Sequence, residues 1–293
     1  MELVIENLSK TYPKGAQALK NINLNITNGL FGLLGPNGAG KSTLIKTIAT
    51  LQKPDSGRIT IDKLNVLEEK RQVRRILGYL PQEFRLYKNI TAFELLEHIA
   101  ILKSVRDKEI RRSLCNRVLK QTNLFEFRNK RLGSYSAGMK QRFGVAQAMI
   151  GDPKIIIVDE PTAGLDPAER KHFLNALSAI SENVIVILST HIIDDVEEIC
   201  TSMSVIDKGE LKYTGKPSEA TEQLRGKIWE KVITRGEESE FQEKYTVLSS
   251  RLTEGMVEIH IYSDHNPGTF EPVKPDLEDA YFAILKNCIQ NKN

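Results

Sequence analysis

One short segment of this 293-residue chain has residue types and spacing suited to binding phosphate: Gly35-Pro36-Asn37-Gly38-Ala39-Gly40-Lys41-Ser42. Its glycines let the backbone bend so that successive amides can point at one anion. A helix expected from Thr43 to Leu51 would add positive potential at its N-terminus. Lys41 would reach the β- and γ-phosphates and Ser42 would ligate Mg²⁺. The segment therefore favours a nucleoside triphosphate site over a plain glycine-rich turn.

Two adjacent carboxylates supply a second candidate for chemistry. Asp159 and Glu160 follow the apolar run 155–158, which we expect to be a buried strand. Because α/β sheets place their ligand sites at the carboxyl ends of strands, this pair is expected beside the phosphate loop. Asp159 suits the hold on Mg²⁺, and Glu160 suits a general base toward the attacking water. A solvated strand end is the alternative interpretation.

The elements that must position these residues indicate an α/β fold. Strict alternation over 21–26 predicts a half-buried, antiparallel strand, whereas 30–34, 155–158 and the run from 184 predict strands buried on both faces. Residues 83–150 instead predict helices, including one that begins in a Thr91–Glu94 capping box. We therefore predict an α/β core that carries a helical insert.

Composition narrows the class of protein. With 40% hydrophobic and 27% charged residues the chain is not broadly disordered, and its net charge of +3 does not by itself indicate a nucleic-acid partner. Aliphatic runs stop at five residues and no signal sequence is apparent, so we expect neither a bilayer span nor secretion. The three cysteines lack metal-ligand spacing, which favours buried thiols in a reducing, cytosolic compartment.

The charge balance changes sign near residue 215, so we predict an accessory domain over 215–293, called here the appendage. Within it Val257, Ile259 and Ile261 alternate with Glu258, His260 and Tyr262, and Asp276 could cap a closing helix. This pattern predicts a small α+β unit without chemistry of its own. Four histidines lack a carboxylate or cysteine partner at ligand spacing and are assigned structural roles: His98, His172, His260 and His265.

Further motifs in residues 1–214 make the chain resemble the ATP-binding subunit of an ATP-binding cassette (ABC) transporter. The family's adenine-stacking aromatic matches Tyr12, its Q-loop glutamine matches Gln82, and its switch histidine matches His191. The remaining matches are the signature sequence, Tyr135-Ser136-Ala137-Gly138-Met139, and the D-loop, Ala163-Gly164-Leu165-Asp166. The resemblance implies a P-loop ATPase core over 1–214 with an antiparallel β-subdomain, a helical subdomain over about 83–150, and the appendage.

The signature departs from the commonest family form, Leu-Ser-Gly-Gly-Gln. Ser136 and Gly138 remain, and the resemblance implies that their hydroxyl and amide meet the γ-phosphate. Ala137 replaces a glycine, which is harmless only where its φ is negative. Met139 replaces the glutamine and cannot donate a hydrogen bond to the ribose.

The resemblance also implies roles for individual residues. Glu160, His191 and Lys41 would be catalytic, and Ser42, Gln82 and Asp159 would bind Mg²⁺. The residues that would bind ATP are Tyr12, Gly35, Pro36, Asn37, Gly38, Ala39, Gly40, Lys41, Ser42 and Thr43. Ser136, Gly138 and Asp166 would contact ATP held by a second cassette. The implied assembly is a homodimer, or a heterodimer with a related ATPase, on a separate membrane permease at the inner face of the cell membrane, without nucleic acid.

The signature with its following Lys-Gln-Arg, the appendage and the segment 277–281 resemble the ATPases of ABC-2-type exporters, which implies outward transport. The alternative is a soluble ABC ATPase of the ABC-F type or of DNA maintenance. A single phosphate loop, and the lack of a long heptad insertion between Lys41 and Ser136, disfavour that alternative. Co-purification with a membrane protein, rather than with ribosomes or DNA, would separate the two.

Overall fold

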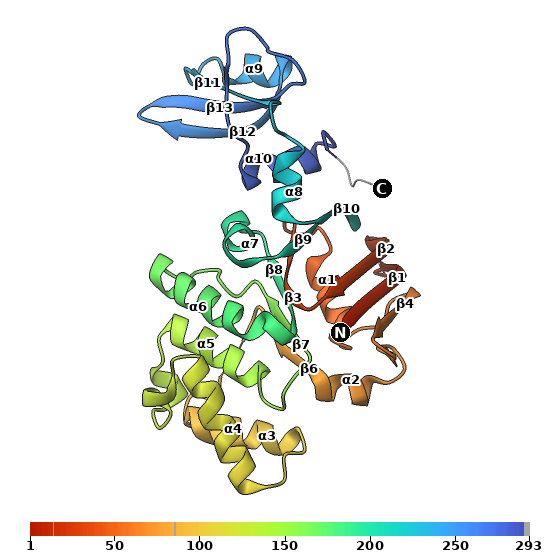
Figure 1. Ribbon diagram of the computed structural model, residues 1–293, viewed down its shortest axis with the longest axis vertical. Helices are drawn as coiled ribbons and strands as arrows, with labels where there is room; N and C mark the ends of the chain where they lie inside the picture. Colours follow the sequence, from red (N-terminus) through yellow and green to blue (C-terminus); the bar gives the residue numbers. More distant parts are fainter. Residues whose placement is uncertain (14, 85, 290–293) are drawn as a thin grey trace.

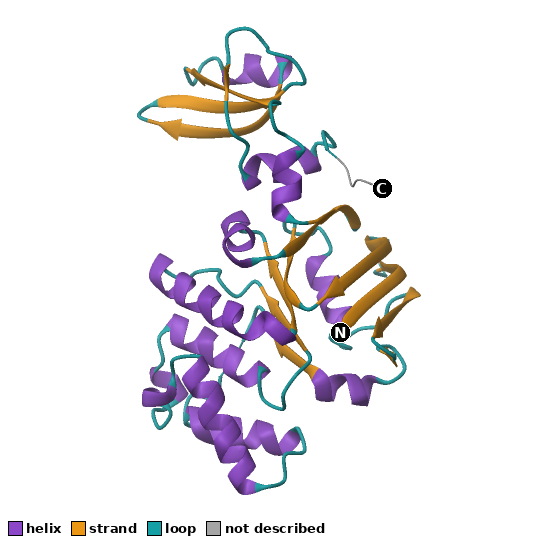
Figure 2. Cartoon of the chain, in the orientation of Figure 1, coloured by secondary structure: helices purple, strands orange, loops and turns teal. Residues whose placement is uncertain are grey.

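The computed structural model describes residues 1–13, 15–84 and 86–289. Three sheets and the helices around them form a body and a smaller lobe at its end (Figure 1). Figure 2 shows that strands gather on one side of the body and in the lobe, while helices fill the other side of the body. The mixed α/β architecture with a helical insert, predicted from the sequence, is confirmed.

The central sheet has the strand order β10-β9-β3-β8-β7-β6. Its inner strands are parallel, and only β10 runs antiparallel to its neighbour. Every residue of β7 and β8 is buried, as expected for strands covered on both faces. The bounds are β3 (Gly29–Leu34), β6 (Leu77–Leu80), β7 (Ile155–Asp159), β8 (Ile185–Thr190), β9 (Ser202–Asp207) and β10 (Glu210–Gly215).

An antiparallel sheet of order β2-β1-β4-β5 packs beside the central sheet. The alternation seen over 21–26 belongs to β2, which is longer than predicted because its pairing with β1 extends to both ends. The inward side chains of this sheet join α1 and the central sheet in one apolar cluster. The bounds are β1 (Glu2–Thr11), β2 (Gln17–Thr27), β4 (Ser56–Ile61) and β5 (Leu64–Asn65).

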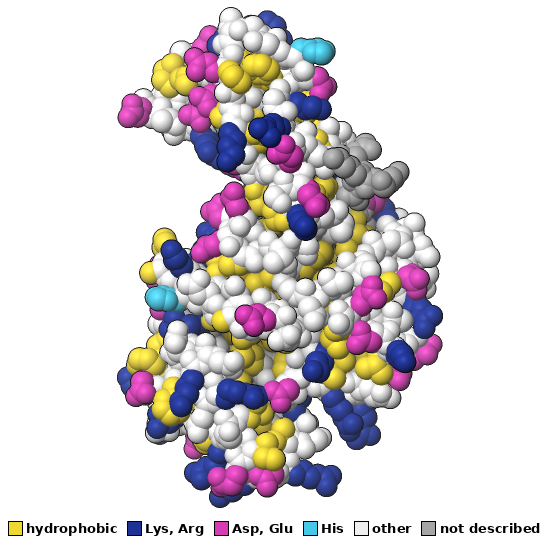
Figure 3. Space-filling model, in the orientation of Figure 1, with side chains coloured by type: hydrophobic (Ala, Val, Ile, Leu, Met, Phe, Trp, Pro, Cys, Tyr) yellow, Lys and Arg dark blue, Asp and Glu magenta, His cyan; other side chains and the backbone are white. Residues whose placement is uncertain are grey.

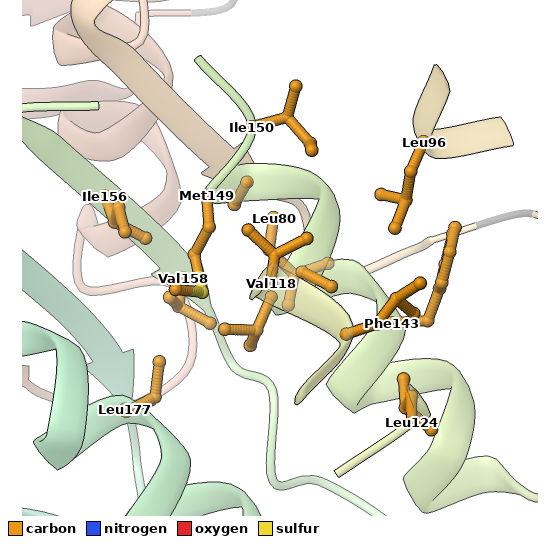
Figure 4. Close-up of a cluster of buried hydrophobic side chains, with 14 of the residues drawn as sticks. Leu80, Leu96, Val118, Leu124, Phe143, Met149, Ile150, Ile156, Val158 and Leu177 are labelled. Atoms are coloured by element: carbon orange, nitrogen blue, oxygen red, sulfur yellow. The ribbon is translucent and has the colours of Figure 1, made fainter. Parts of the chain in front are cut away.

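The helical subdomain has its own apolar core, which is continuous with one face of the central sheet. Figure 4 shows Val118 and Phe143 from its helices beside Leu80 and Val158 from the ends of the strands. The capping box at Thr91 is confirmed, because its hydroxyl accepts from the Glu94 amide and the Glu94 carboxylate accepts from the Thr91 amide. The bounds are α3 (Ala92–Leu102), α4 (Lys108–Gln121), η1 (Phe125–Phe127), η2 (Leu132–Ser134) and α5 (Ala137–Ala148).

The remaining helices of the body cover the central sheet and its edge. Helix α1 begins two residues earlier than predicted, because Gly40 takes the left-handed conformation that ends the phosphate loop. None of the helices in the described part of the chain combines the length and apolar character that a bilayer span requires. The bounds are α1 (Lys41–Ile48), α2 (Lys70–Ile76), α6 (Pro167–Ile180), η3 (Ser181–Asn183) and α7 (Ile193–Ile199).

The appendage forms a third sheet of order β12-β13-β11-β14 with one helix on each face (Figure 1). As predicted, Asp276 caps the closing helix α10, accepting from the Asp279 amide. Figure 3 shows the lobe set apart from the body by a narrower waist. The bounds are α8 (Pro217–Glu222), β11 (Ile228–Ile233), α9 (Glu238–Lys244), β12 (Thr246–Thr253), β13 (Met256–Tyr262), β14 (Glu271–Pro272) and α10 (Leu277–Leu285).

Helices α8 and α10 of the appendage also pack on the body. They share an apolar cluster with Leu34, at the end of β3, and with Val196 in α7. The boundary predicted at residue 215 therefore separates two sheets but crosses one continuous core, and it remains a prediction.

Candidate active site

A cleft of about 770 Å³ lies beside the ends of β3, β7 and β8. Most of the residues predicted to bind or cleave a nucleotide surround it, although they come from distant parts of the sequence. The lining residues are Tyr12, Ala16, Gln17, Ala18, Pro36, Asn37, Gly38, Gly40, Lys41, Ser42, Thr43, Gln82, Glu160, Ala163 and His191. Gly35, Ala39 and Asp159 are buried next to this lining.

The phosphate loop joins β3 to α1, as its sequence requires. Gly40 has φ +115°, and a side chain there would place its Cβ 2.5 Å from the Ala18 carbonyl oxygen. Lys41 Nζ donates to the carbonyls of Gly35 (2.5 Å) and Pro36 (3.1 Å). Burial lowers the pKa of Lys41 from its ordinary value, and the nearby Glu160 charge opposes that shift. A cationic amine and the amides at the start of α1 thus share one concave surface, as anion binding requires.

Glu160 connects three of the predicted site residues. Its Oε1 lies 3.5 Å from Lys41 Nζ, and its Oε2 accepts from Gln82 Nε2 at 3.0 Å and lies 3.4 Å from His191 Nδ1. Parallel pairing of β7 with β8, which sets Asp159 opposite Ser189, brings Glu160 and His191 together at one sheet edge. Glu160 has φ +46°, a region that non-glycine residues rarely occupy and that is found at functional sites.

Asp159 lies deeper, at the end of β7, and is 2% exposed. Burial raises the pKa of this carboxyl group, the neighbouring Ser189 hydroxyl opposes that shift, and the charge of Glu160 adds to it. Within the described residues its Oδ1 has no hydrogen-bond partner. A buried carboxylate oxygen without a partner fits the charge of a divalent cation, so Asp159 and the hydroxyl of Ser42 have the donor chemistry of a Mg²⁺ site.

Tyr12 stands at the edge of the cleft with 39% of its surface exposed. Its hydroxyl lies 3.2 Å from Thr43 Oγ1 and donates to Gln52 Oε1 at 3.1 Å. Gln52 in turn donates to the Thr43 carbonyl, which fixes the segment after α1 against the helix. The ring of Tyr12 is thereby held next to the phosphate loop, where it can stack on a base.

Ser136, Gly138 and Asp166 are not among the described residues that line the cleft. Ser136 is exposed, and its Oγ caps α5 by accepting from the Met139 amide at 3.1 Å. Asp166 is exposed as well and caps α6 by accepting from the Glu169 amide at 2.9 Å. Both side chains therefore lie at helix N-termini on the molecular surface, and neither belongs to the described lining of the cleft.

The departures in the signature fit the local backbone. Ala137 opens α5 and is absent from the described residues with positive φ, so its extra methyl group causes no strain. A Cβ at Gly138 would lie 2.2 Å from Glu169 Oε2, so a larger residue there would displace the Glu169 side chain. That carboxylate accepts from Arg142 Nη1 at 2.6 Å and so joins the signature helix α5 to α6.

Asp195 was missed by the sequence analysis. It is fully buried in α7 and accepts from Thr162 Oγ1 (2.6 Å), Thr190 Oγ1 (3.0 Å) and Arg170 Nε (2.6 Å). It thus holds together the turn after Glu160, the strand end before His191 and helix α6. An acidic residue in Asp194-Asp195 carries no local signal for this role, because only the fold shows which of the two is buried.

Comparisons with known proteins agree with this geometry. The ABC transporter family matches residues 19–163. The chain is 33% identical to YxlF of Bacillus subtilis (strain 168), an uncharacterized ABC transporter ATP-binding protein, over 98% of this chain and 91% of YxlF. It is 36% identical to YbhF of Escherichia coli (strain K12), a probable multidrug ABC transporter ATP-binding protein, over 67% of this chain but only 34% of YbhF.

Solved structures show the same fold. The dimeric structure of MJ0796, a bacterial ABC transporter cassette, has a TM-score of 0.66 and 31% identity and covers 73% of this chain and 98% of that one. A second MJ0796 structure, with the same TM-score, identity and coverage, is a dimeric post-hydrolysis state bound to ADP and Pi. The matched part leaves about a quarter of this chain uncovered.

Proposed function

Because this chain belongs to the family of ABC transporter ATP-binding proteins, we propose that it binds ATP in the cleft at the phosphate loop and hydrolyses it between two closed cassettes. The observation that carries the proposal is the arrangement around Glu160, where Lys41, Gln82 and His191 converge on one carboxylate within 3.5 Å. Such a group can activate water beside the phosphates that the loop holds.

Each residue around the cleft would have a distinct role in ATP hydrolysis. The water oxygen attacks the γ-phosphorus, its proton passes to the Glu160 carboxylate, and the bond to the bridging β-phosphate oxygen breaks to release ADP. Lys41 and the loop amides offset the negative charge of the β- and γ-phosphates. His191, 3.4 Å from Glu160, steadies the γ-phosphate on the other side. The ring of Tyr12 stacks on adenine.

Ser42, Gln82 and Asp159 have the donors to hold Mg²⁺ beside the phosphates. When bound, this ion would supply positive charge that offsets the negative charge of the phosphates. The buried, unpartnered Oδ1 of Asp159 supports this assignment.

The exposed position of Ser136 in the signature supports a dimer. Ser136 and Gly138 stand at the start of a helix and are not among the described residues that line the cleft of their own chain, which supports their meeting a γ-phosphate held by a second cassette. Asp166 at the start of α6 lies on the same kind of exposed turn. Each copy would therefore complete the site of the other, as a homodimer or with a related ATPase. MJ0796, which is dimeric, is a precedent for such pairing.

We further propose that the dimer drives a separate membrane permease, most simply in the direction of export, from the inner face of the cell membrane. The name of YbhF, a probable multidrug transporter ATP-binding protein, supports export, although this chain spans only a third of YbhF. The alternative of a soluble ABC ATPase without a permease is not favoured, because the relatives carry transporter names.

A complementation experiment tests the shared site. The variant Lys41→Ala cannot bind phosphate productively, and Ser136→Asp keeps a capping side chain on α5 but places a carboxylate against the partner's γ-phosphate. Each variant alone should be nearly inactive. A one-to-one mixture should recover about a quarter of the wild-type sites, because half of randomly paired dimers contain one intact site of two.

Ser136→Thr is the matched control, since it keeps both the hydroxyl and the cap, and it should retain most of the activity. ATPase activity of the mixture no higher than that of the separate variants would contradict the shared site.

A further inference from the structure

A histidine and two glutamates lie together on one face of the appendage sheet. Antiparallel pairing of β11 with β13 sets Glu230 directly opposite His260, and Glu258 precedes His260 by two residues on the same face. Helix α10 covers this face through Asp279, whose Oδ1 lies 2.8 Å from His260 Nδ1. The assignment of His260 as a residue without a carboxylate partner is therefore wrong, because strand pairing and α10 bring acidic groups that sequence spacing does not show.

Asp279 orients the His260 imidazole and determines which of its nitrogens is free to bind a metal. Its carboxylate accepts from His260 Nδ1 and from the Asp276 amide (3.2 Å), so in the neutral imidazole Nδ1 carries the proton and the lone pair of Nε2 is available to a metal. The His260 side chain is 9% exposed. Within the described residues Nε2 makes no hydrogen bond, but it points at Glu230 Oε2 (3.8 Å) and Glu258 Oε1 (3.9 Å). These distances are too long for hydrogen bonds.

The same distances fit one ion between the three side chains. Two ligand atoms that each lie about 2.1 Å from a metal are at most about 4.2 Å apart. The ligand atoms of Glu230, Glu258 and His260 all lie within 4.8 Å of one another, so small side-chain adjustments would place them around one centre.

Charge also favours a cation here. Three carboxylates, from Glu230, Glu258 and Asp279, surround one imidazole on a half-buried surface. The cation nearest in register is Arg251, paired with Glu258, but its guanidinium contacts Asp276 and Glu278 instead. Among the described residues no lysine or arginine pairs with Glu230 or Glu258, so within this part of the chain only the imidazole offsets their charge.

We propose that Glu230, Glu258 and His260 bind a divalent transition-metal ion of the zinc class. One imidazole nitrogen and two carboxylates are ligands that Zn²⁺ accepts, with water in the fourth position. Asp279 is the positioning residue that orients the imidazole, an arrangement common behind metal-bound histidines. The ion would join β11, β13 and, through Asp279, α10. This site is independent of the ATP site.

The test uses the full chain, stripped of metal by chelation and dialysis, and titrated with Zn²⁺ by calorimetry. Glu258→Gln and Glu230→Gln remove one ligand charge each at half-buried positions with little change of shape. Each should weaken the Zn²⁺ affinity by more than tenfold, whereas Glu240→Gln, at an exposed position in α9, should leave it unchanged. Asp279→Asn should weaken the affinity by about 10–100-fold.

Two further measurements do not depend on the variants folding identically. Zn²⁺ should raise the melting temperature of the unmutated chain by linkage. Crystals of the unmutated chain soaked in Zn²⁺ should show anomalous scattering at coordination distance from His260 Nε2. Absence of that signal, or unchanged affinity in both ligand variants, would overturn the proposal. ATP hydrolysis by Glu258→Gln should equal that of the wild type, so the result does not depend on the proposed function.

Discussion

Replacing Glu160 by glutamine isolates the chemical step, because the two side chains have the same shape. In the cleft, Glu160 lies 3.5 Å from Lys41 Nζ, accepts from Gln82 at 3.0 Å and lies 3.4 Å from His191. An amide can still accept from Gln82 but cannot take a proton from water at neutral pH. The substitution Glu160→Gln therefore removes the base and leaves the phosphate loop intact.

The expected size of the effect follows from the role. A positioned general base contributes about 10²–10⁴-fold to the rate, which is about 3–5 kcal/mol of activation free energy. The turnover number for ATP should fall by that factor.

ATP binding should not be weakened by the same substitution. At 3.5 Å and an effective dielectric constant of about 20, the Glu160 carboxylate attracts Lys41 by about 5 kcal/mol before desolvation is counted. Glutamine frees that amine for the phosphates and removes a negative charge that would repel them. We therefore expect the affinity for ATP to stay the same or to increase.

The assay combines ATP turnover at saturating ATP with light scattering. The variant should form an ATP-dependent dimer that persists, because the closed state is no longer lost by hydrolysis. Glu83→Gln, an exposed neighbour of the Q-loop glutamine, is the matched control and should behave like the wild type. Undiminished turnover in Glu160→Gln would refute the assignment of the base.

Three further substitutions test the frame around the site. Gly40→Ala should destabilise the fold by more than about 2 kcal/mol and abolish ATP binding, because its Cβ would meet a carbonyl oxygen at 2.5 Å with φ +115°. Gly38→Ala, with φ +81° and no described atom near its Cβ, should lower the free energy of unfolding by only about 1–2 kcal/mol. Urea unfolding measures both variants. Asp195→Asn should lower the free energy of unfolding by about 3–5 kcal/mol by weakening a buried ion pair, while the exposed Asp194→Asn should change it by less than about 0.5 kcal/mol. Tyr12→Ala should weaken ATP binding by about 1–3 kcal/mol through loss of stacking, measured by calorimetry, whereas Tyr12→Phe, which keeps the ring but loses the two hydroxyl contacts, should weaken it less.

Local sequence was enough to predict the strands and turns whose own residues determine them. The strands around 30–34, 155–158 and 184–188 are apolar on both faces, and the structure buries them in the central sheet as expected. The caps at Thr91 and Asp276 form as predicted, because both partners of each lie within three residues. Element bounds were less accurate where pairing across the sheet, as in β2, set the length.

The sequence predicted those site residues that directly follow strands of the parallel sheet, because the ends of such strands meet at one edge. Strand order brings Lys41, Glu160 and His191 into one cleft, as the motifs suggested. Contacts between elements were not predictable in the same way. Asp195 and His260 acquire their partners only when α7 and α10 pack, and no spacing along the chain encodes those contacts.

The packing of α8 and α10 against the body has a practical consequence for anyone who wishes to isolate the ATPase. Truncation after residue 214 would remove the α8 and α10 side chains that pack with Leu34 and Val196. Leu34 is the strand residue just before the phosphate loop, and Val196 lies in the helix that follows His191. Water would then reach this apolar surface, and we expect such a fragment to aggregate or to lose activity. We therefore expect a stable ATPase fragment to include α8 and α10.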